Sequence, residues 1–226
     1  MKFLKKCPIC TFSTPNDLKN YITIVDRTYF KCPNCKSITL LEEFYLDLKS
    51  QKERYLLHNN SLEDEGYKSY LETFLTTSID FFNEFGNCET KDAFYLDFGS
   101  GPEPCLFNLV LLKGIFKKAF AYDLFFAPDL PDEKVDFITC LEVAEHFENP
   151  VESFCQISSL LKTGGIVSVQ TQILRENIVF EKWWYRQDST HVCFYTEEGL
   201  FQCAKKAGLS FLKRTGNTCC FRKDFS

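Results

Sequence analysis

The second half of the chain alternates short apolar runs with longer amphipathic stretches. Such apolar runs are typical of strands that are buried on both faces, and the amphipathic stretches follow the 3.6-residue period of helices. This alternation predicts a parallel sheet with right-handed crossovers and helices on both faces. The predicted strands are Tyr95–Phe98, Lys117–Asp123, Val135–Cys140 and Ile166–Thr171, and the predicted helices are Glu103–Leu112, Pro150–Leu161 and Thr196–Ala207.

Turn and cap residues mark the ends of several of these elements. The last helix begins with the capping residue Thr196 and ends at Gly208, and Lys162-Thr163-Gly164-Gly165 predicts a glycine cap on the helix before it. Two further strands after Gly208 predict a terminal hairpin. The hairpin strands are Leu209–Lys213 and Thr218–Arg222, joined by Thr215-Gly216-Asn217.

Four cysteines near the N-terminus form two Cys-x-x-Cys pairs. Cys7-Pro8-Ile9-Cys10 and Cys32-Pro33-Asn34-Cys35 both carry proline in second position, and Tyr21–Phe30 between them alternates like a strand. Zinc takes four soft ligands at tetrahedral corners, which two such turns supply. A thioredoxin-like redox pair is the alternative for one pair alone. The sequence therefore predicts a separate structural zinc ribbon whose ligands are Cys7, Cys10, Cys32 and Cys35.

The remaining cysteines and the absence of targeting signals indicate a compartment. The chain has 12 cysteines, and those outside the two pairs show no ligand spacing, so we expect them to be buried thiols. The sequence contains no signal peptide and no apolar stretch of about 18 residues. We therefore expect a cytoplasmic protein with reduced thiols and no membrane partner.

Charge sets limits on the partners of the chain. The formal net charge is −5, but residues 1–36 contain seven Lys and Arg against two Asp and Glu. Four thiolates bound to one zinc ion would reduce this local excess. The remaining positive charge is too small to predict nucleic-acid binding, so nucleic acid stays an open partner class that charge does not support.

A Gly-x-Gly turn follows the first strand of the second half, in the segment Tyr95–Pro104. Glycines at such a turn allow close approach of a ligand, and the next helix offers free N–H groups. The third glycine of a dinucleotide loop is replaced by Pro104. Asp97 would repel a pyrophosphate, but its carboxylate can accept hydrogen bonds from an ammonium group. These departures favour S-adenosylmethionine as the cofactor.

A second acidic residue supports a nucleoside cofactor. Asp123 ends the second predicted strand, near the offset at which such an acid binds ribose hydroxyls. Asp129 and Asp132 are weak candidates for adenine contacts, because no clear strand is visible in Leu124–Lys134. The residues that we expect to bind the cofactor are Asp97, Gly99, Ser100, Gly101, Asp123, Leu124 and Glu142.

Four motifs in this order resemble those of class I S-adenosylmethionine-dependent methyltransferases. They are Leu96–Pro102, Tyr122-Asp123, Glu142–Phe147 and Leu160–Gly165. The resemblance covers roughly residues 90 to 215. It implies a Rossmann-like sheet of seven strands, with an antiparallel last strand that the terminal hairpin would supply.

The same resemblance implies a lid and an acceptor pocket. The segment before the first strand often folds over the cofactor in this family, which assigns Tyr55, His58 and Tyr67 to the pocket. Aromatic rings near a sulfonium can attract it and shape the acceptor site. The cluster after Ile166–Thr171 lies at the carboxyl edge of the expected sheet and adds Trp183, Trp184 and Arg186 to the substrate pocket.

Two glutamates and two histidines form a further candidate set. Glu142, Glu145 and His146 share one face of a helical turn, and together with the distant His191 they could hold a second divalent metal. This arrangement resembles the metal site of small-RNA 2′-O-methyltransferases. The Glu-x-x-Glu-His turn is also common in methyltransferases without metal, which favours His146 or His191 as a general base. Tyr195 is a third candidate catalytic residue.

These patterns together predict a methyltransferase of unidentified acceptor with an N-terminal zinc ribbon. The expected division is a zinc ribbon over residues 1–45, a helical linker or lid over 46–88 and a Rossmann-like domain over 89–226. Two alternatives stay open. One is a non-catalytic zinc-ribbon binding module on a vestigial Rossmann scaffold, and the other is a nicotinamide-dependent oxidoreductase, which Asp97 and Pro104 disfavour.

Overall fold

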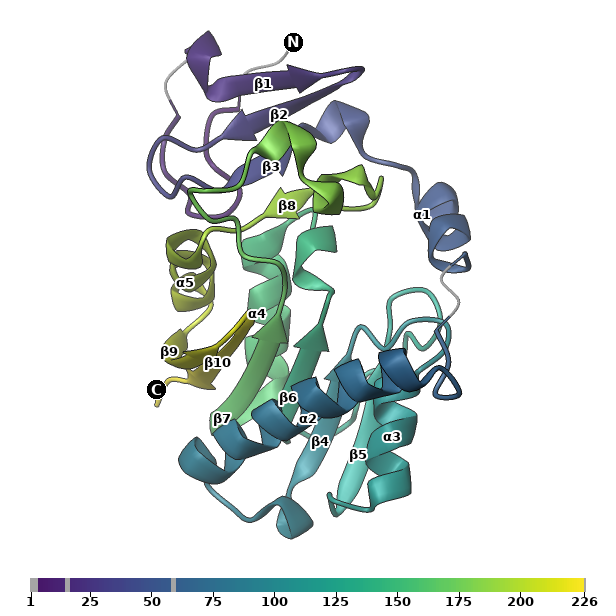
Figure 1. Ribbon diagram of the computed structural model, residues 1–226. Helices are drawn as coiled ribbons and strands as arrows, with labels where there is room; N and C mark the ends of the chain where they lie inside the picture. The colour runs from purple at the N-terminus through teal and green to yellow at the C-terminus, as the bar shows by residue number, and fades with distance from the viewer. Residues whose placement is uncertain (1–3, 15–16, 58–59, 226) are drawn as a thin grey trace.

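A computed structural model describes residues 4–14, 17–57 and 60–225. Its centre is a six-stranded sheet that is parallel except at one edge (Figure 1). The strands lie in the order β5-β4-β6-β7-β10-β9. Their bounds are β4 Phe94–Phe98, β5 Lys118–Tyr122, β6 Val135–Leu141, β7 Leu161–Gln170, β9 Leu209–Thr215 and β10 Thr218–Lys223.

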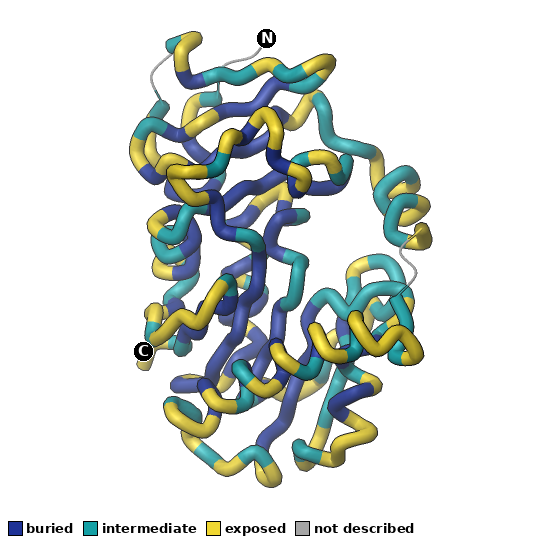
Figure 2. The backbone as a smooth tube through the Cα atoms, viewed as in Figure 1, coloured by how far each residue is buried: buried dark blue, intermediate teal, exposed yellow. Residues whose placement is uncertain are grey.

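Helices cover both faces of this sheet, as the alternating pattern predicts. Neighbouring residues of one strand pack on opposite faces: Tyr95 and Phe137 belong to one apolar core, and Leu96 and Ile138 to the other. Figure 2 shows the central strands as the most continuously buried part of the molecule. The first core contains α2 (Glu65–Phe85) and α3 (Cys105–Lys113), and the second contains α4 (Pro150–Leu160) and α5 (Glu197–Lys206).

The sheet has six strands in the described residues, so the expected number of seven is wrong by one. Residues 124–134 form no strand and contain Pro128 and Pro131, which cannot donate to a strand ladder. A single bridge between Asp123 and Ala127 turns the chain back instead. The expected antiparallel end of the sheet is present, because β10 pairs antiparallel with both β7 and β9.

The predicted glycine cap after α4 is a bulge at the start of β7. Val135 pairs with Leu161, and Phe137 pairs with Ile166, so the β7 strand carries extra residues between these two pairs. Gly164 has a φ of +75°, and a Cβ on Gly165 would lie 2.9 Å from the carbonyl oxygen of Lys162. Glycine is needed here to let the bulged strand fold back on itself.

The segment before the sheet contains two helices, α1 (Leu48–Tyr55) and α2. Each begins at an aspartate cap: Asp47 accepts from the amide of Ser50, and Asp64 accepts from the amide of Tyr67. α2 crosses the face of the large sheet, and α1 lies between the start of α2 and the N-terminal sheet (Figure 1). Within the described residues, none of the helices is sufficiently long and apolar to span a membrane.

A second, smaller sheet lies beyond the carboxyl ends of the large sheet (Figure 1). Its order is β1-β2-β3-β8, and β8 comes from the late part of the chain. The two sheets share one apolar core. The bounds are β1 Tyr21–Ile24, β2 Arg27–Lys31, β3 Ile38–Leu40 and β8 Cys193–Phe194.

Short 3-10 helices connect the larger elements. Two of them carry functional candidates: one follows β6 at the Glu145 turn, and another contains the Trp184 segment. The bounds are η1 Leu18–Asn20, η2 Glu42–Phe44, η3 Thr90–Asp92, η4 Ala144–His146, η5 Phe180–Lys182 and η6 Trp184–Gln187.

Candidate active site and cysteine knuckles

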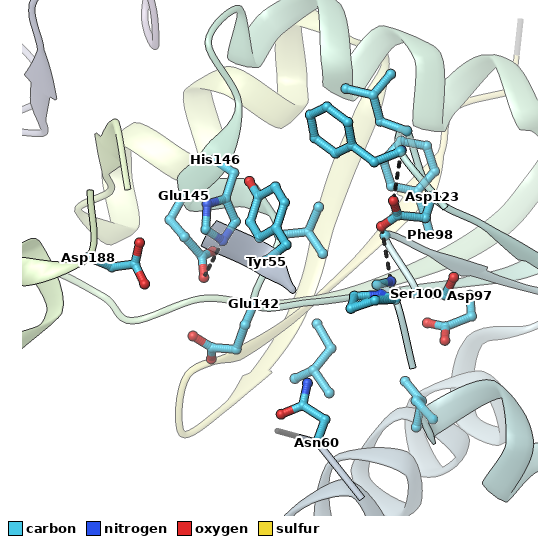
Figure 3. Close-up of a pocket in the computed structure, with 18 of the residues that line it drawn as sticks. Tyr55, Asn60, Asp97, Phe98, Ser100, Asp123, Glu142, Glu145, His146 and Asp188 are labelled. Atoms are coloured by element: carbon cyan, nitrogen blue, oxygen red, sulfur yellow. Dashed lines mark hydrogen bonds and ion pairs between the residues drawn. The ribbon is translucent and has the colours of Figure 1, made fainter. Parts of the chain in front are cut away.

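A cavity of about 800 Å³ opens where β4, β5 and β6 end. β5 and β6 pair with opposite sides of β4, which leaves a crevice at the carboxyl ends of these strands. Tyr55 of α1 lies over the middle of the cavity in Figure 3. Polar side chains lie in two groups along it, Asp97, Ser100 and Asp123 at one end and Glu142, Glu145 and His146 at the other.

The glycine loop after β4 is fixed to the neighbouring strand β5. The amides of Gly99 and Ser100 donate to the carbonyl of Tyr122, at 2.7 and 3.0 Å. Gly99 and Gly101 have positive φ angles of +85° and +72°, which glycine adopts without steric cost. A Cβ on Gly99 would overlap Val143, whereas one on Gly101 would meet no described atom within 4 Å. Gly101 therefore leaves space for a ligand beside the loop.

This difference gives a matched pair of variants. Gly99→Ala and Gly101→Ala both place alanine at positive φ, which costs about 1–2 kcal/mol of stability in each. Only Gly99→Ala adds overlap with Val143, so we expect a further loss of about 1–3 kcal/mol there. Gly101→Ala should instead weaken binding of S-adenosylhomocysteine. Chemical denaturation and calorimetry measure the two effects, and equal stability losses would contradict this assignment.

Asp97 lies near the end of β4 and lines the cavity, although its side chain is almost fully buried. The Thr139 hydroxyl donates to its Oδ1 at 3.2 Å, and the hydroxyl of Tyr95 lies 2.6 Å from that of Thr139. Burial raises the pKa of Asp97 to about 7, against the opposing effect of the Thr139 hydrogen bond. A bound ammonium group would favour the ionised carboxylate, because opposite charges stabilise each other.

Asp123 joins the end of β5 to the glycine loop. Its Oδ2 accepts from the amide of Gly101 at 2.9 Å, and its Oδ1 accepts from the amides of Phe125 and Phe126 at 2.9 and 3.1 Å. A carboxylate has about four acceptor positions, so one remains for a ribose hydroxyl. The buried Ser100 hydroxyl has no hydrogen-bond partner in the described part of the chain. This end of the cavity thus fits a polar cofactor.

The exposed side chain of Leu124 lies at the rim of the same end. Leu124, Asp97, Asp123 and the glycine loop therefore meet in one place, as the sequence predicts for a cofactor site. Neither Asp129 nor Asp132, the weak candidates for adenine contacts, is part of the cavity lining.

Glu142 directly follows β6 and has a φ of +50°, an uncommon conformation for a residue other than glycine. Its two carboxylate oxygens accept hydrogen bonds from the hydroxyls of Tyr70 and Tyr185, at 3.2 and 3.0 Å. The Gln170 side chain donates to Tyr70 at 2.7 Å. Burial, and then the nearby Glu145, raises the pKa of Glu142 to about 8. Glu142 therefore connects β6 to α2 and to the loop after β7.

Glu145, His146 and His191 place three metal-ligand atoms within 4.8 Å of one another. Glu145 is fully buried, and its Oε2 accepts from the Thr171 hydroxyl at 2.9 Å. Its Oε1 lies 4.0 Å from His146 Nε2 and has no hydrogen-bond partner among the described residues. Glu142 is not part of this group, so the structure assembles three of the four predicted ligands.

Backbone carbonyls fix the protons of both histidines. His146 Nδ1 lies 3.0 Å from the carbonyl of Thr190, and His191 Nδ1 lies 2.7 Å from the carbonyl of Tyr185. A carbonyl oxygen only accepts, so we assign the ring proton to Nδ1 in each histidine. The lone pair then lies on Nε2. The two rings meet edge to face with their centroids 4.7 Å apart.

The first helix of the predicted lid covers the cavity. Arg54 of α1 forms an ion pair with Asp188 at 2.6 Å, and the Tyr55 ring meets the His146 ring edge to face at 5.3 Å. Burial alone would raise the pKa of Asp188, but hydrogen bonds from Thr190 and the positive charge of Arg54 hold it at about 2. Tyr67 also lines the cavity. The predicted contact from His58 lies outside the described residues.

Only part of the aromatic cluster that follows β7, which the sequence assigns to the substrate pocket, lines the cavity. Trp184 lies at the rim, 64 % exposed. Trp183 and Arg186 are not among the cavity residues: Trp183 packs on Phe194, and Arg186 donates to the carbonyl of Glu181. The buried Tyr195 is also outside the cavity. These positions do not support the predicted substrate and catalytic roles of Trp183, Arg186 and Tyr195.

Three cavity residues were not singled out by their sequence pattern. Tyr70, Tyr185 and Arg54 form the hydrogen bonds and the ion pair described above. Tyr185 lies inside the predicted aromatic cluster, and the η6 turn directs it inward. The one available signal was helical spacing, since Tyr67 and Tyr70 are three residues apart and stack on each other.

The four N-terminal cysteines come together in two equivalent turns. Thr11 and Lys36, which follow the second cysteine of each pair, have positive φ angles of +58° and +61°. All four sulfur atoms lie within 4.8 Å of one another. The Sγ atoms are 3.9 Å apart for Cys7 and Cys35, and 3.6 Å for Cys10 and Cys32. A tetrahedron with Zn–S bonds of 2.3 Å has edges of about 3.8 Å, so the cluster is consistent with a zinc ribbon.

Comparisons with solved structures agree with this fold. One similar structure is a chain of the complex of the Haloferax volcanii Trm112 methyltransferase activator with a methyltransferase. It is 14 % identical in sequence to this chain, with a TM-score of 0.54, and the match covers 73 % of this chain and 94 % of that one. Another is the Burkholderia thailandensis 1,6-didemethyltoxoflavin-N1-methyltransferase with bound S-adenosylhomocysteine. Its identity is 12 %, its TM-score 0.55, and the match covers 91 % of this chain and 100 % of that one.

The sequence itself matches a known family over most of its length. The search of curated proteins finds no match to the chain. The match to the family described as Methyltransferase domain covers residues 67–213, which includes the glycine loop, both strand-end acids and the two histidines. This result disagrees with the nicotinamide-dependent alternative. The chain therefore belongs to the methyltransferase-domain family.

Proposed function

We propose that the protein transfers the methyl group of S-adenosylmethionine to a hydroxyl or amine, with His146 as the general base. The supporting observation is that one cavity joins the Asp97–Asp123 end to the histidine end. The cofactor supplies an activated methyl group when it is bound. The chain must then hold the donor, align the acceptor and remove one proton.

The Asp97 end of the cavity is the proposed cofactor site. Asp97 would accept from the ammonium group of the methionine tail, and Asp123 would accept from the ribose hydroxyls. The space beside Gly101 and the unpartnered hydroxyl of Ser100 favour a ligand there. α1 covers the cavity through the Arg54–Asp188 ion pair, which would keep water away during transfer.

His146 is the proposed base because its Nε2 carries the lone pair on the cavity side. Its Nδ1 proton is held by the carbonyl of Thr190. Burial lowers the pKa of His146, so the ring is neutral at pH 7 and can accept a proton. Tyr55 packs against the ring and would orient an acceptor that enters beneath α1.

Incubation with methyl-labelled S-adenosylmethionine and fractionated cell extract tests this proposal. We expect a fraction in which label moves to an acceptor in proportion to enzyme, and we expect S-adenosylhomocysteine to raise the Tm. Binding of S-adenosylhomocysteine without transfer to any small-molecule, RNA or protein fraction would instead support the vestigial scaffold. Arg54→Ala removes the ion pair that holds α1 over the cavity. This variant should still bind the cofactor but release it faster.

A second candidate is a divalent metal held by Glu145, His146 and His191. The observation that favours it is the unpartnered Oε1 of Glu145, buried beside His146 Nε2. A buried acceptor without a partner is costly, and a cation would satisfy it. Mixed oxygen and nitrogen ligands suit Mg²⁺, Mn²⁺ or Zn²⁺, and such an ion would lower the pKa of a ligated hydroxyl.

Glu145→Gln separates the two candidates. The amide keeps the size of the side chain but is a weak metal ligand. With a metal, we expect Glu145→Gln to lose Mn²⁺ binding in calorimetry and to lose as much activity as His191→Asn. Without a metal, activity survives mild chelation, and the histidine variants lose more than Glu145→Gln. Glu142→Gln is the matched control, because Glu142 lies outside the three-residue group.

We also propose that Cys7, Cys10, Cys32 and Cys35 bind one structural zinc ion. The side chain of Asn34 supports the site by donating to Cys10 Sγ at 3.6 Å. Zinc would hold these thiols as thiolates and contribute folding free energy directly. Elemental analysis of protein purified without chelator should find at least one zinc per chain, and Cys7→Ser with Cys32→Ser should remove it.

A further inference from the structure

The late strand β8 completes the sheet of the cysteine knuckles. β3 pairs antiparallel with β8, so that Ile38 faces Phe194 and Thr39 faces Cys193. β8 has two residues, which is too short to form stable pairing alone. The N-terminal sheet therefore provides its only strand partner in the described residues. Val192 comes immediately before β8, and it directly follows His191 in the chain.

Val192 lies between the small sheet and the active-site turn. Its carbonyl accepts from the amide of Leu40 at 2.8 Å, and its own amide donates to the carbonyl of Glu145 at 2.9 Å. One residue thus connects the end of β3 to the turn that carries Glu145 and His146. A shift of β3 would move Val192 and the neighbouring His191 with it.

The same short segment takes part in the Nδ1 contacts of both histidines, because Thr190 supplies the acceptor for His146 and His191 is itself part of the segment. The carbonyl of Thr190 accepts from His146 Nδ1, and His191 Nδ1 donates to the carbonyl of Tyr185. The hydroxyl of Tyr195, on the other side of β8, donates to the carbonyl of Ala144 at 2.8 Å. Residues 190–195 therefore hold the Glu145 turn from both sides.

The second knuckle anchors the far end of this segment. The Thr196 hydroxyl donates to the carbonyl of the zinc-ligand candidate Cys35 at 2.5 Å, and the Thr196 amide donates to Ser37 Oγ at 3.1 Å. A Cβ on Gly199 would overlap Ser37 Oγ, so α5 lies directly against the knuckle. Glycine at position 199 is what permits this close approach.

Aromatic packing adds to these hydrogen bonds. Tyr29 of β2 is fully buried and meets Phe180 and Phe194 edge to face, at 5.1 and 6.1 Å between ring centroids. Phe180 and Phe194 flank the loop that carries the acceptor cluster. The N-terminal sheet therefore buries its core against the loop between β7 and β8 and leaves that face unavailable for a separate partner.

We propose that the cysteine-knuckle unit, residues 4–14 and 17–41, is a positioning element of the active site. It holds residues 190–196 so that His146 and His191 keep their Nδ1 protons and present Nε2 to the cavity. This inference rests on the proposed function of the two histidines. It gives the zinc ribbon a role within the enzyme in place of recognition of a separate partner.

Histidine-selective ¹⁵N NMR tests this positioning directly. The chain has three histidines, so the spectrum is simple to assign with His146→Asn and His191→Asn. In the zinc-loaded protein we expect both His146 and His191 as the Nδ1–H tautomer. Ser37→Ala keeps all four cysteines and removes a partner of Thr196, and Gly199→Ala pushes α5 away from the knuckle.

We expect both variants to retain zinc and to bind S-adenosylhomocysteine within about twofold of the wild type. The tautomers of His146 and His191 should become mixed, and kcat should fall on the order of 10- to 100-fold, the usual effect of a small misplacement. Thr23→Ala is the control, because Thr23 lies in β1 at the opposite edge of the small sheet.

Two results would overturn the proposal. One is a pair of pure Nδ1–H tautomers in zinc-loaded Gly199→Ala, and the other is the same pair in protein whose zinc has been removed by chelation. If the tautomers change but no variant alters methyl transfer, the positioning is correct and the role of His146 as base is wrong. The NMR experiment therefore tests the positioning, and the kinetic experiment tests the role of His146 as base.

Discussion

His146→Asn is expected to lower kcat about 10²- to 10⁴-fold, the range lost when a general base is removed. Asparagine can still donate from its amide to the carbonyl of Thr190, as His146 Nδ1 does, so the backbone contact survives. The basic Nε2 is absent. The affinity for S-adenosylhomocysteine should remain unchanged, because the cofactor end of the cavity is formed by other residues. Single-turnover kinetics with labelled donor measure the effect.

The pH profile shows whether the lost group is the base. Burial lowers the pKa of His146, so the wild-type rate should rise with pH through a pKa below the usual value for histidine and stay level at neutral pH. His146→Asn should lose this acidic limb. His191→Asn is the matched comparison, because His191 makes the same type of Nδ1 contact with Tyr185. A full acidic limb in His146→Asn would assign the base to another group.

Asp97→Asn is expected to weaken S-adenosylhomocysteine binding at pH 8 by about 1.5–3 kcal/mol, or roughly 10- to 150-fold. The asparagine side chain has the same shape but no negative charge for the ammonium group of the ligand. Thr139 can still donate to the side-chain oxygen, so the local fold should persist. Calorimetry gives the affinity, and an unchanged Kd would remove Asp97 from the cofactor site.

The raised pKa of Asp97 gives this prediction a pH dependence of known sign. Burial raises the pKa of Asp97 to about 7 in the free protein. Below pH 7 the carboxyl is protonated and must release its proton before it binds an ammonium group, so wild-type affinity should rise with pH through about 7. Asp97→Asn should show a flat profile, and the gap between the two proteins should shrink about tenfold per pH unit below 7, closing between about pH 6 and pH 5. Asp123→Asn is the control, because it should weaken binding at every pH.

Sequence patterns were most reliable where a motif is local. The glycine loop needs Gly99 because its neighbour Val143 leaves no space for a Cβ. The loop is visible in the sequence as the close succession of strand, acid and glycine within one segment. The two Cys-Pro-x-Cys turns likewise define the cysteine cluster by short spacing. The strands around Tyr95 and Phe137 follow from apolar runs that pack on both faces of the sheet.

The candidate site was harder to predict where it depends on the direction of side chains. Glu142 shares a turn with Glu145, but its positive φ directs it to the hydroxyls of Tyr70 and Tyr185. The helical spacing of Glu142, Glu145 and His146 alone had placed Glu142 among the metal candidates. Trp183 and Trp184 are adjacent tryptophans that the sequence cannot tell apart, yet Trp183 packs in the core against Phe194. A one-residue difference in an irregular loop decides which side chain faces the cavity.

By itself, the sequence determined the family, the main strands and helices of the large sheet, the glycine loop and the pairing of the four N-terminal cysteines, because each depends on residues that are close in the chain. The tertiary structure alone decided that β8 pairs with β3 and that Val192 connects this pair to Glu145. A two-residue strand has no detectable period, and its partner lies far away in the sequence. Such pairing is set by packing of the whole chain. The family resemblance suggests that His191 joins the Glu145 turn, but only the structure shows how β8 and the contacts of Val192 bring His191 beside His146.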